Sequence, residues 1–177
     1  MKRVLVTAFK PFNNLSNNYS MDVLNFIDGV DKLILDVLYD EAYYEIINNY
    51  NLDDVDLIVA LGEARMRDEL TLDVVAKNIA SCSIADNNGV YKKDEIIIVS
   101  APSSITTDVD VNSVKDIVKL SNDAGKFVCN NLYYYLLYNC PSKAIFIHIP
   151  NCYKDEEIIK KYAFTIKKII KKILKED

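Results

Sequence analysis

The feature that most constrains the fold is an alternation of short β-rich runs with stretches of helical periodicity. The strand-like runs are Arg3 to Ala8, Lys32 to Leu38, Asp56 to Leu61, Glu95 to Val99 and Ala144 to Ile149. Helical patterns at Ser20 to Ile27 and Asp40 to Tyr50 separate the first three, and Asp40 is expected to cap the second helix. Such alternation predicts an α/β fold, a three-layer α/β/α sandwich with a mostly parallel central sheet.

Two further segments complete the predicted architecture. Turn chemistry at Asn87, Asn88 and Gly89 predicts a short antiparallel excursion between Leu70 to Ser83 and Tyr91 to Val99. From Asp155 onward, apolar residues recur at helical spacing with lysines between them, which predicts an amphipathic helix packed on the sheet. The alternative for this helix is a membrane-surface anchor. With 177 residues and 50% apolar side chains, the chain is expected to form a single domain spanning residues 1–177.

Composition and charge exclude several classes of function. The net charge of -5 and the lack of a basic patch argue against nucleic acid as a partner. No apolar run approaches the roughly 20 residues of a spanning helix, and the N-terminus reaches polar residues too early for a secretory signal. We therefore expect no membrane partner and a cytoplasmic location. The four cysteines form no CxxC pair, so reduced thiols are expected.

His148 is the first candidate for chemistry. It is the only histidine of the chain, and it ends a strand-like run at the sheet edge where sites form in α/β proteins. Imidazole is the side chain best suited to move protons near neutral pH. The alternative is a structural histidine with its hydrogen bonds satisfied inside the strand.

Cys129 is the second candidate, because it follows a small Ala124-Gly125 turn and opens a run with helical spacing. Amide groups at a helix N-terminus are expected to lower the pKa of its thiol and to hold an oxyanion. The alternative is an inert buried cysteine. A metal site built from Cys140, His148 and Cys152 lacks familiar ligand spacing, so no metal is expected.

The motifs SNDAGKFVCN and FIHIP resemble the cysteine and histidine motifs of the pyroglutamyl peptidases, also called pyrrolidone-carboxylate peptidases. VLVTAFKPF resembles the family's first strand and two-phenylalanine loop, DLIVALG its third strand, and LTLDVVAKN its glutamate motif. The resemblance implies a cysteine omega-peptidase that hydrolyses the amide bond after an N-terminal pyroglutamyl residue. It further implies a peptide substrate with N-terminal pyroglutamate, no metal or cofactor, and a homo-oligomer, either a tetramer or a dimer.

The same resemblance implies roles for seven residues. The catalytic triad would be Cys129 as nucleophile, His148 as proton carrier and Asp73 as the acid. The substrate-binding residues would be Phe9, Phe12, Phe127 and Asn18. The phenylalanines flank an apolar lactam ring in this interpretation, and core packing is the simpler alternative for each. For Asp73 the alternative is a solvated or capping acid.

Several residues depart from the family pattern. Asp73 replaces a glutamate and is shorter by roughly 1.5 Å, so the imidazole is expected to be poorly held and the activity attenuated. An ionised Glu63 facing the site would repel an oxyanion. The other departures are Val74, Ser83, Asn13 and Asn14 at one glycine pair, and Arg65 and Met66 at another. They leave open a diverged, weakly active binding module for a small molecule or peptide terminus, or a cysteine hydrolase acting on another amide or ester.

Overall fold

The computed structural model describes residues 2–175 of the chain. The helices are α1 (Tyr19–Asn25), α2 (Glu41–Asn49), α3 (Val128–Asn139) and α4 (Glu156–Leu174), with 3-10 turns η1 (Leu52–Asp54) and η2 (Val111–Ser113). The strands are β1 (Val4–Phe9), β2 (Asp31–Leu35), β3 (Leu57–Glu63), β4 (Thr71–Asp73), β5 (Val75–Lys77), β6 (Ser104–Thr106), β7 (Lys119–Ser121) and β8 (Lys143–Ile149).

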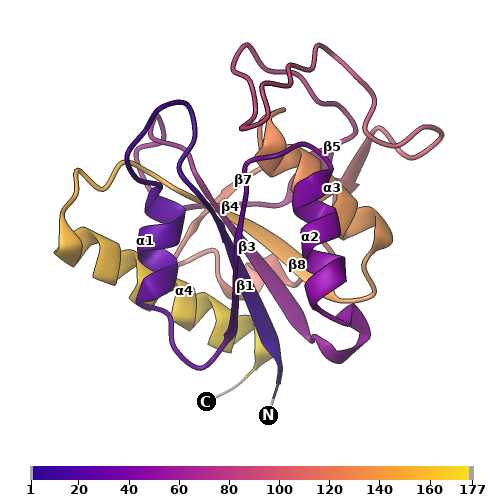
Figure 1. The fold of residues 1–177 in the computed structure, drawn as a ribbon. Helices are drawn as coiled ribbons and strands as arrows, with labels where there is room; N and C mark the ends of the chain where they lie inside the picture. Colours follow the sequence, from indigo (N-terminus) through magenta and orange to yellow (C-terminus); the bar gives the residue numbers. More distant parts are fainter. Residues whose placement is uncertain (1, 176–177) are drawn as a thin grey trace.

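A six-stranded sheet in the order β2-β1-β3-β8-β4-β7 forms the centre of the structure (Figure 1). Strands β2, β1, β3 and β8 are parallel, whereas β4 runs antiparallel to β8 and parallel to β7. Strands β5 and β6 form a separate antiparallel pair. The predicted mostly parallel sheet with a short antiparallel excursion is therefore confirmed.

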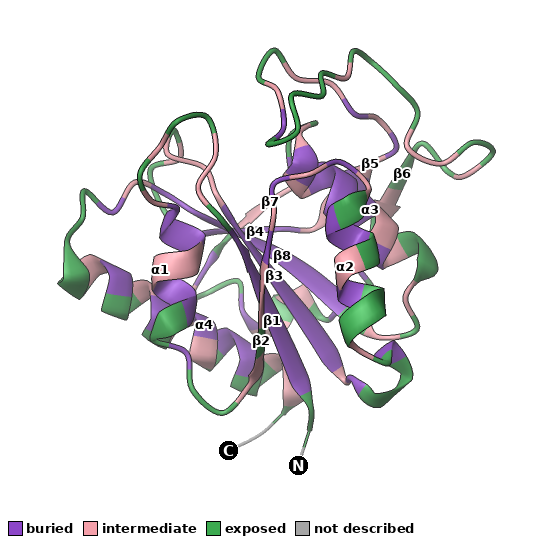
Figure 2. Ribbon diagram, viewed as in Figure 1, coloured by how far each residue is buried: buried purple, intermediate pink, exposed green. Residues whose placement is uncertain are grey.

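Helices cover both faces of this sheet, so the α/β/α layering is also confirmed. Because strand side chains alternate between faces, Ile145, Ile147 and Ile149 of β8 join the core beneath α1 and α4. Phe146 of the same strand joins the opposite core, beneath α2 and α3. Figure 2 shows the central strands buried between these two helical layers.

The strand predicted at Glu95 to Val99 is wrong. Among the residues that the structure describes, the only β-pairing of this segment is an isolated antiparallel bridge between Ala80 and Glu95, which flank the predicted turn. The next residues bond to a side chain instead of a strand, because the Asn78 carboxamide oxygen accepts from the amides of Ile97 and Ile98 at 3.0 and 2.9 Å. The Asn78 side chain thus takes the place of the strand partner that the β-branched residues favour.

Asp40 precedes α2 as predicted but does not cap it. Its φ is 62° and its side chain makes no capping hydrogen bond. Its carboxylate instead accepts from Asn131 Nδ2 at 2.9 Å and pairs with Lys92 Nζ at 2.9 Å. Asp40 therefore links α2 to α3, the helix that carries Cys129.

Helix α4 packs as the sequence predicts. Asp155 caps it by accepting from the amides of Glu157 and Ile158, and its apolar side is buried against α1 and the sheet. The packing alternative is thus confirmed over a membrane-surface anchor. Among residues 2–175, no helix has the length and apolarity needed to cross a membrane.

Replacing Ile166 by Ala tests this packing. Ile166 is 0% exposed, so we expect the free energy of unfolding to fall by about 2–5 kcal/mol in urea titrations. The control is Phe164→Ala on the outer side of the same helix, where 58% exposure predicts a change within about 0.5 kcal/mol. Equal losses in both variants would contradict the assigned buried face.

Candidate active site

The three predicted catalytic residues come from three different elements. His148 is the penultimate residue of β8, Asp73 is the last residue of β4, and Cys129 is the second residue of α3. In the antiparallel register Asp73 lies opposite Phe146, so His148 is its diagonal neighbour on the same face of the sheet. That face is covered by α3.

Asp73 and His148 are in direct contact. The distance from Asp73 Oδ2 to His148 Nδ1 is 2.5 Å, and the two residues are 0% and 4% exposed. Tyr133 Oη also donates to the Asp73 carbonyl at 2.9 Å. The prediction that the shorter acid holds the imidazole poorly is therefore wrong, because β4 brings the Asp73 backbone close enough to β8. An ionised carboxylate can only accept, so this contact places the proton on Nδ1 and leaves Nε2 free.

The second oxygen of Asp73 faces an arginine that the sequence analysis missed. Arg67 Nη2 lies 3.0 Å from Asp73 Oδ1, as an ion pair without hydrogen-bond geometry. A buried carboxylate requires such a compensating charge. The sequence holds one hint of this role, which is that arginine is rare. Its only arginines are Arg3, Arg65 and Arg67, and Arg67 precedes Asp73 by six positions.

Cys129 Sγ packs against Gly62 because Gly62 has no side chain. Gly62 is the register partner of His148 between β3 and β8. A Cβ added to Gly62 would lie 2.8 Å from Cys129 Sγ and 2.8 Å from two ring atoms of Phe146. Within residues 2–175, no hydrogen bond joins the Cys129 thiol to the His148 ring. Such contacts are often long before a substrate binds.

The expected lowering of the Cys129 pKa is wrong. Burial raises the pKa of the Cys129 thiol to about 12, and the charges of Asp73 and Glu63 act in the same direction. Arg67 and a hydrogen bond to the backbone amide of Cys129 lower that pKa, but by less. Desolvation therefore outweighs the helix N-terminus, and the free protein holds a neutral thiol.

Two asparagines directly after Cys129 anchor its helix. The Asn130 side chain accepts from the Lys77 amide at 2.8 Å and donates to the carbonyls of Lys77 and Ile79 at 2.9 and 3.0 Å. Asn131 accepts from the Asp40 amide at 2.8 Å. The sequence analysis did not assign these roles, although both asparagines are buried polar residues that need partners.

A small pocket with a cavity volume of about 30 Å³ opens beside Cys129. Its lining residues are Phe9, Phe12, Asn18, Val37, Glu63, Phe127, Val128 and Cys129. The rings of Phe12 and Phe127 are 5.8 Å apart, and Tyr39 meets Phe127 edge-on at 5.5 Å. The structure thus brings all four predicted substrate-binding residues to the pocket that contains the thiol. Val37 was not foreseen.

The polar atoms of the Asn18 side chain form hydrogen bonds within the protein. Its Oδ1 accepts from the amide and hydroxyl of Ser20 at 3.0 and 2.7 Å, which caps α1, and its Nδ2 donates to the Lys10 carbonyl at 3.1 Å. Its side chain therefore holds the loop between β1 and α1 in place and forms one wall of the pocket.

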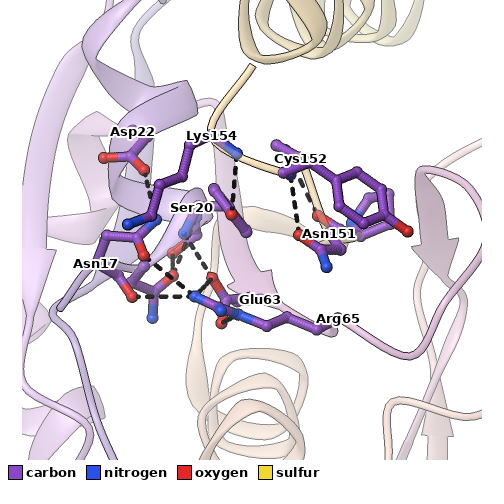
Figure 3. Close-up of polar contacts among 12 residues, drawn as sticks. Asn17, Ser20, Asp22, Glu63, Arg65, Asn151, Cys152 and Lys154 are labelled. Atoms are coloured by element: carbon purple, nitrogen blue, oxygen red, sulfur yellow. Dashed lines mark hydrogen bonds and ion pairs between the residues drawn. The ribbon is translucent and has the colours of Figure 1, made fainter. Parts of the chain in front are cut away.

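Glu63 is paired rather than isolated (Figure 3). Its carboxylate accepts from the Tyr19 amide at 2.7 Å and from Arg65 Nε at 2.6 Å. Arg65 also contacts Asn17 and stacks over the Tyr19 ring at 4.8 Å. Arg65, one of the glycine replacements, thus pairs with the Glu63 carboxylate, although the charge of Glu63 still disfavours a negative charge at Cys129.

The other glycine replacements keep the local backbone. Asn13 and Asn14 have φ values of 51° and 59°, in the left-handed region that asparagine tolerates better than most residues. The loop that carries Phe12 therefore retains a glycine-like conformation without glycine.

No group of three or more metal-ligating residues occurs within residues 2–175. Cys152 is buried in the core beneath α1 and α4, while Cys140 packs against the opposite core. The two thiols are therefore on different faces of the sheet from each other.

Comparison with known proteins shows one consistent relationship. The sequence model of the family described as pyroglutamyl peptidase matches residues 2–174. Pyrrolidone-carboxylate peptidases from Brachyspira hyodysenteriae and Fusobacterium nucleatum are 31% and 30% identical, covering 90% and 91% of this chain and 87% and 83% of theirs. The crystal structure of the pyrrolidone carboxyl peptidase from Fervidobacterium islandicum superposes with a TM-score of 0.85, 25% identity and 99% coverage of both chains.

Replacing Gly62 by Ala tests the approach of the thiol to the sheet. The added methyl would lie 2.8 Å from Sγ and the Phe146 ring, so α3 or Phe146 must shift. We expect displacement on the order of 1 Å and a loss of about 100-fold in kcat on a pyroglutamyl amide. Wild-type kcat in this variant would contradict the close packing. The control is Gly29→Ala, which has open space around it but a φ of 76°, so it should cost stability and leave kcat unchanged.

Alkylation of Cys129 by iodoacetamide tests the raised thiol pKa. Only the thiolate reacts, and the pKa of this thiol is about 12, so the rate should still be climbing at pH 10. An unperturbed thiol would level off above its pKa of roughly 8.5. The reaction is followed by intact mass, with Cys129→Ser to assign the site. A rate that has already levelled off by pH 10 would contradict the raised pKa.

Proposed function

Because the chain belongs to the pyroglutamyl peptidase family, we propose that it hydrolyses the amide bond after an N-terminal pyroglutamyl residue. The observation that carries this proposal is the contact of 2.5 Å between Asp73 and His148, beside a thiol that opens into a phenylalanine-lined pocket. The substrate is a peptide with N-terminal pyroglutamate, and no cofactor is required.

We propose that Cys129 is the nucleophile and His148 the proton carrier. Since the free thiol is neutral, Nε2 of His148 takes the proton as sulfur attacks the carbonyl carbon. The imidazolium then gives that proton to the leaving amine. Water, activated by the same nitrogen, attacks the thioester and releases pyroglutamate and the thiol. Asp73 holds the ring orientation through Nδ1 in both halves of the reaction.

The N-terminus of α3 supports the developing oxyanion in this proposal. Cys129 is the second residue of the helix, and the Phe127 N-cap position makes no side-chain capping bond. Backbone amides in the first turn lack helical acceptors and are suited to an anionic oxygen.

The aromatic pocket accounts for selection of the lactam ring. Phe9, Phe12 and Phe127 present apolar surface to the ring faces, while the lactam N–H and C=O require polar partners at the edge. Glu63 lies at this pocket with acceptor oxygens, so it suits a ring N–H donor.

The alternative of a binding module without turnover loses two of its three motivations. Asp73 reaches His148, and the charge of Glu63 is paired with Arg65. The third is Ser83, which stands where the family has an arginine. Attenuated activity stays a prediction, as do a homo-oligomer, a single domain over residues 1–177 and a cytoplasmic location.

Release of a fluorescent amine from a pyroglutamyl-amide substrate tests the proposed function. We expect turnover by the wild type, none by Cys129→Ala, and a fall of about 10⁴-fold in kcat for Asp73→Asn, because the imidazole loses its orienting carboxylate. Cys140→Ala removes a thiol at the other end of α3 and should stay close to wild type. No release by folded wild-type protein, or full activity in Cys129→Ala, would overturn the proposal.

A further inference from the structure

Arg67 connects two segments that must be aligned for the proposed reaction. Its Nη2 lies 3.0 Å from Asp73 Oδ1 and donates to the Asp123 carbonyl at 2.7 Å. Asp73 ends β4, whereas Asp123 lies in the turn that leads into α3. One guanidinium nitrogen therefore contacts the carboxylate next to His148 and the segment just before Cys129.

The turn around Asp123 is well defined, so a contact to it can be transmitted. The Asp123 amide donates to Ser121 Oγ at 3.1 Å, and Asp123 Oδ1 accepts from the Gly125 amide at 2.9 Å. Gly125 has a φ of 81°, which favours glycine. Lys77 Nζ pairs with the same Oδ1 at 3.0 Å. Four residues after Gly125, the chain reaches Cys129.

Asp73 needs a partner on its second oxygen. One oxygen is occupied by His148, and the other is buried with no hydrogen bond among residues 2–175. Without Arg67 the carboxylate would hold one buried, uncompensated oxygen and could rotate away from the imidazole. The ion pair with Arg67 therefore favours the orientation that the triad requires.

Only part of the hydrogen-bonding capacity of the Arg67 guanidinium is used. Arg67 Nη1 is buried and has no hydrogen-bond partner within the described part of the chain. Buried unpaired donors are uncommon in proteins and are often found at functional sites. This favours a position set by the charge of Asp73 and the turn.

We propose that Arg67 is a positioning residue, which holds Asp73 on His148 and fixes the turn that carries Cys129. The inference rests on the proposed triad and adds a fourth residue to it. Arg67 acts through Asp73 and the Asp123 carbonyl rather than on the substrate.

Steady-state kinetics of Arg67→Gln, Arg67→Lys and Lys77→Gln on the pyroglutamyl amide test this assignment. We expect Arg67→Gln to lose about 10- to 100-fold in kcat with little change in KM, since alignment fails while the pocket remains intact. Arg67→Lys should recover part of that loss. Lys77→Gln removes a cation that pairs with Asp123 in the same turn without touching Asp73, so it should lose much less kcat than Arg67→Gln.

Iodoacetamide alkylation separates this inference from the proposed function, because it needs no peptidase activity. The charge of Arg67 lowers the pKa of Cys129, so Arg67→Gln should slow alkylation at every pH below the plateau, and Lys77→Gln should not. If the wild type released no amine, the proposed function would fail while this comparison could still be read. Wild-type kcat and alkylation in Arg67→Gln, or equal losses in Lys77→Gln, would overturn the assignment of Arg67.

Discussion

The contact between Asp73 and His148 is the interaction on which the rest of the site depends. It exists because β4 enters the sheet next to β8 in the antiparallel direction, which places Asp73 opposite Phe146 and diagonal to His148. A register shifted by one residue would turn the carboxylate to the other face of the sheet. The antiparallel pairing of β4 with β8 therefore brings the acid and the imidazole together.

Close packing brings the thiol to this pair. Gly62 leaves room for Cys129 Sγ at the level of His148. The Asn130 side chain binds the Lys77 backbone and so joins α3 to β5, the strand that follows β4. The nucleophile and the acid are thus both tied to the segment from Asp73 to Lys77. Such rigid placement compensates for a thiol that burial keeps neutral, because proton transfer then depends on geometry rather than on a pre-formed thiolate.

The sequence was sufficient for the layers, the parallel strands and the residues with distinctive chemistry. A lone histidine after an apolar strand and a cysteine at the start of a helical run carry strong local signals. Long, regular patterns such as that of α4 were equally readable. The strand at Glu95 to Val99 was wrong, because the Asn78 side chain replaces a strand as hydrogen-bond partner, and that contact joins residues about 20 positions apart.

Electrostatic pairing was the part that the sequence could not supply. Asp73 looked too short because reach was judged from side-chain length, whereas the backbone position of β4 decides it. Glu63 was predicted to repel an oxyanion because the family pattern identifies Arg65 only as the replacement of a glycine, and not as the partner of Glu63. Arg67 was missed since nothing in its local pattern points to Asp73. Each of these depends on which side chains meet in space.

The most direct test of the central claim is the tautomer of His148, read from the imidazole nitrogen signals of the free protein by NMR. The chain has one histidine, so the signals need no assignment. We predict the tautomer with the proton on Nδ1, shared with Asp73, and with Nε2 available as the proton acceptor. A proton on Nε2 alone, or an imidazolium paired with a Cys129 thiolate, would contradict the account.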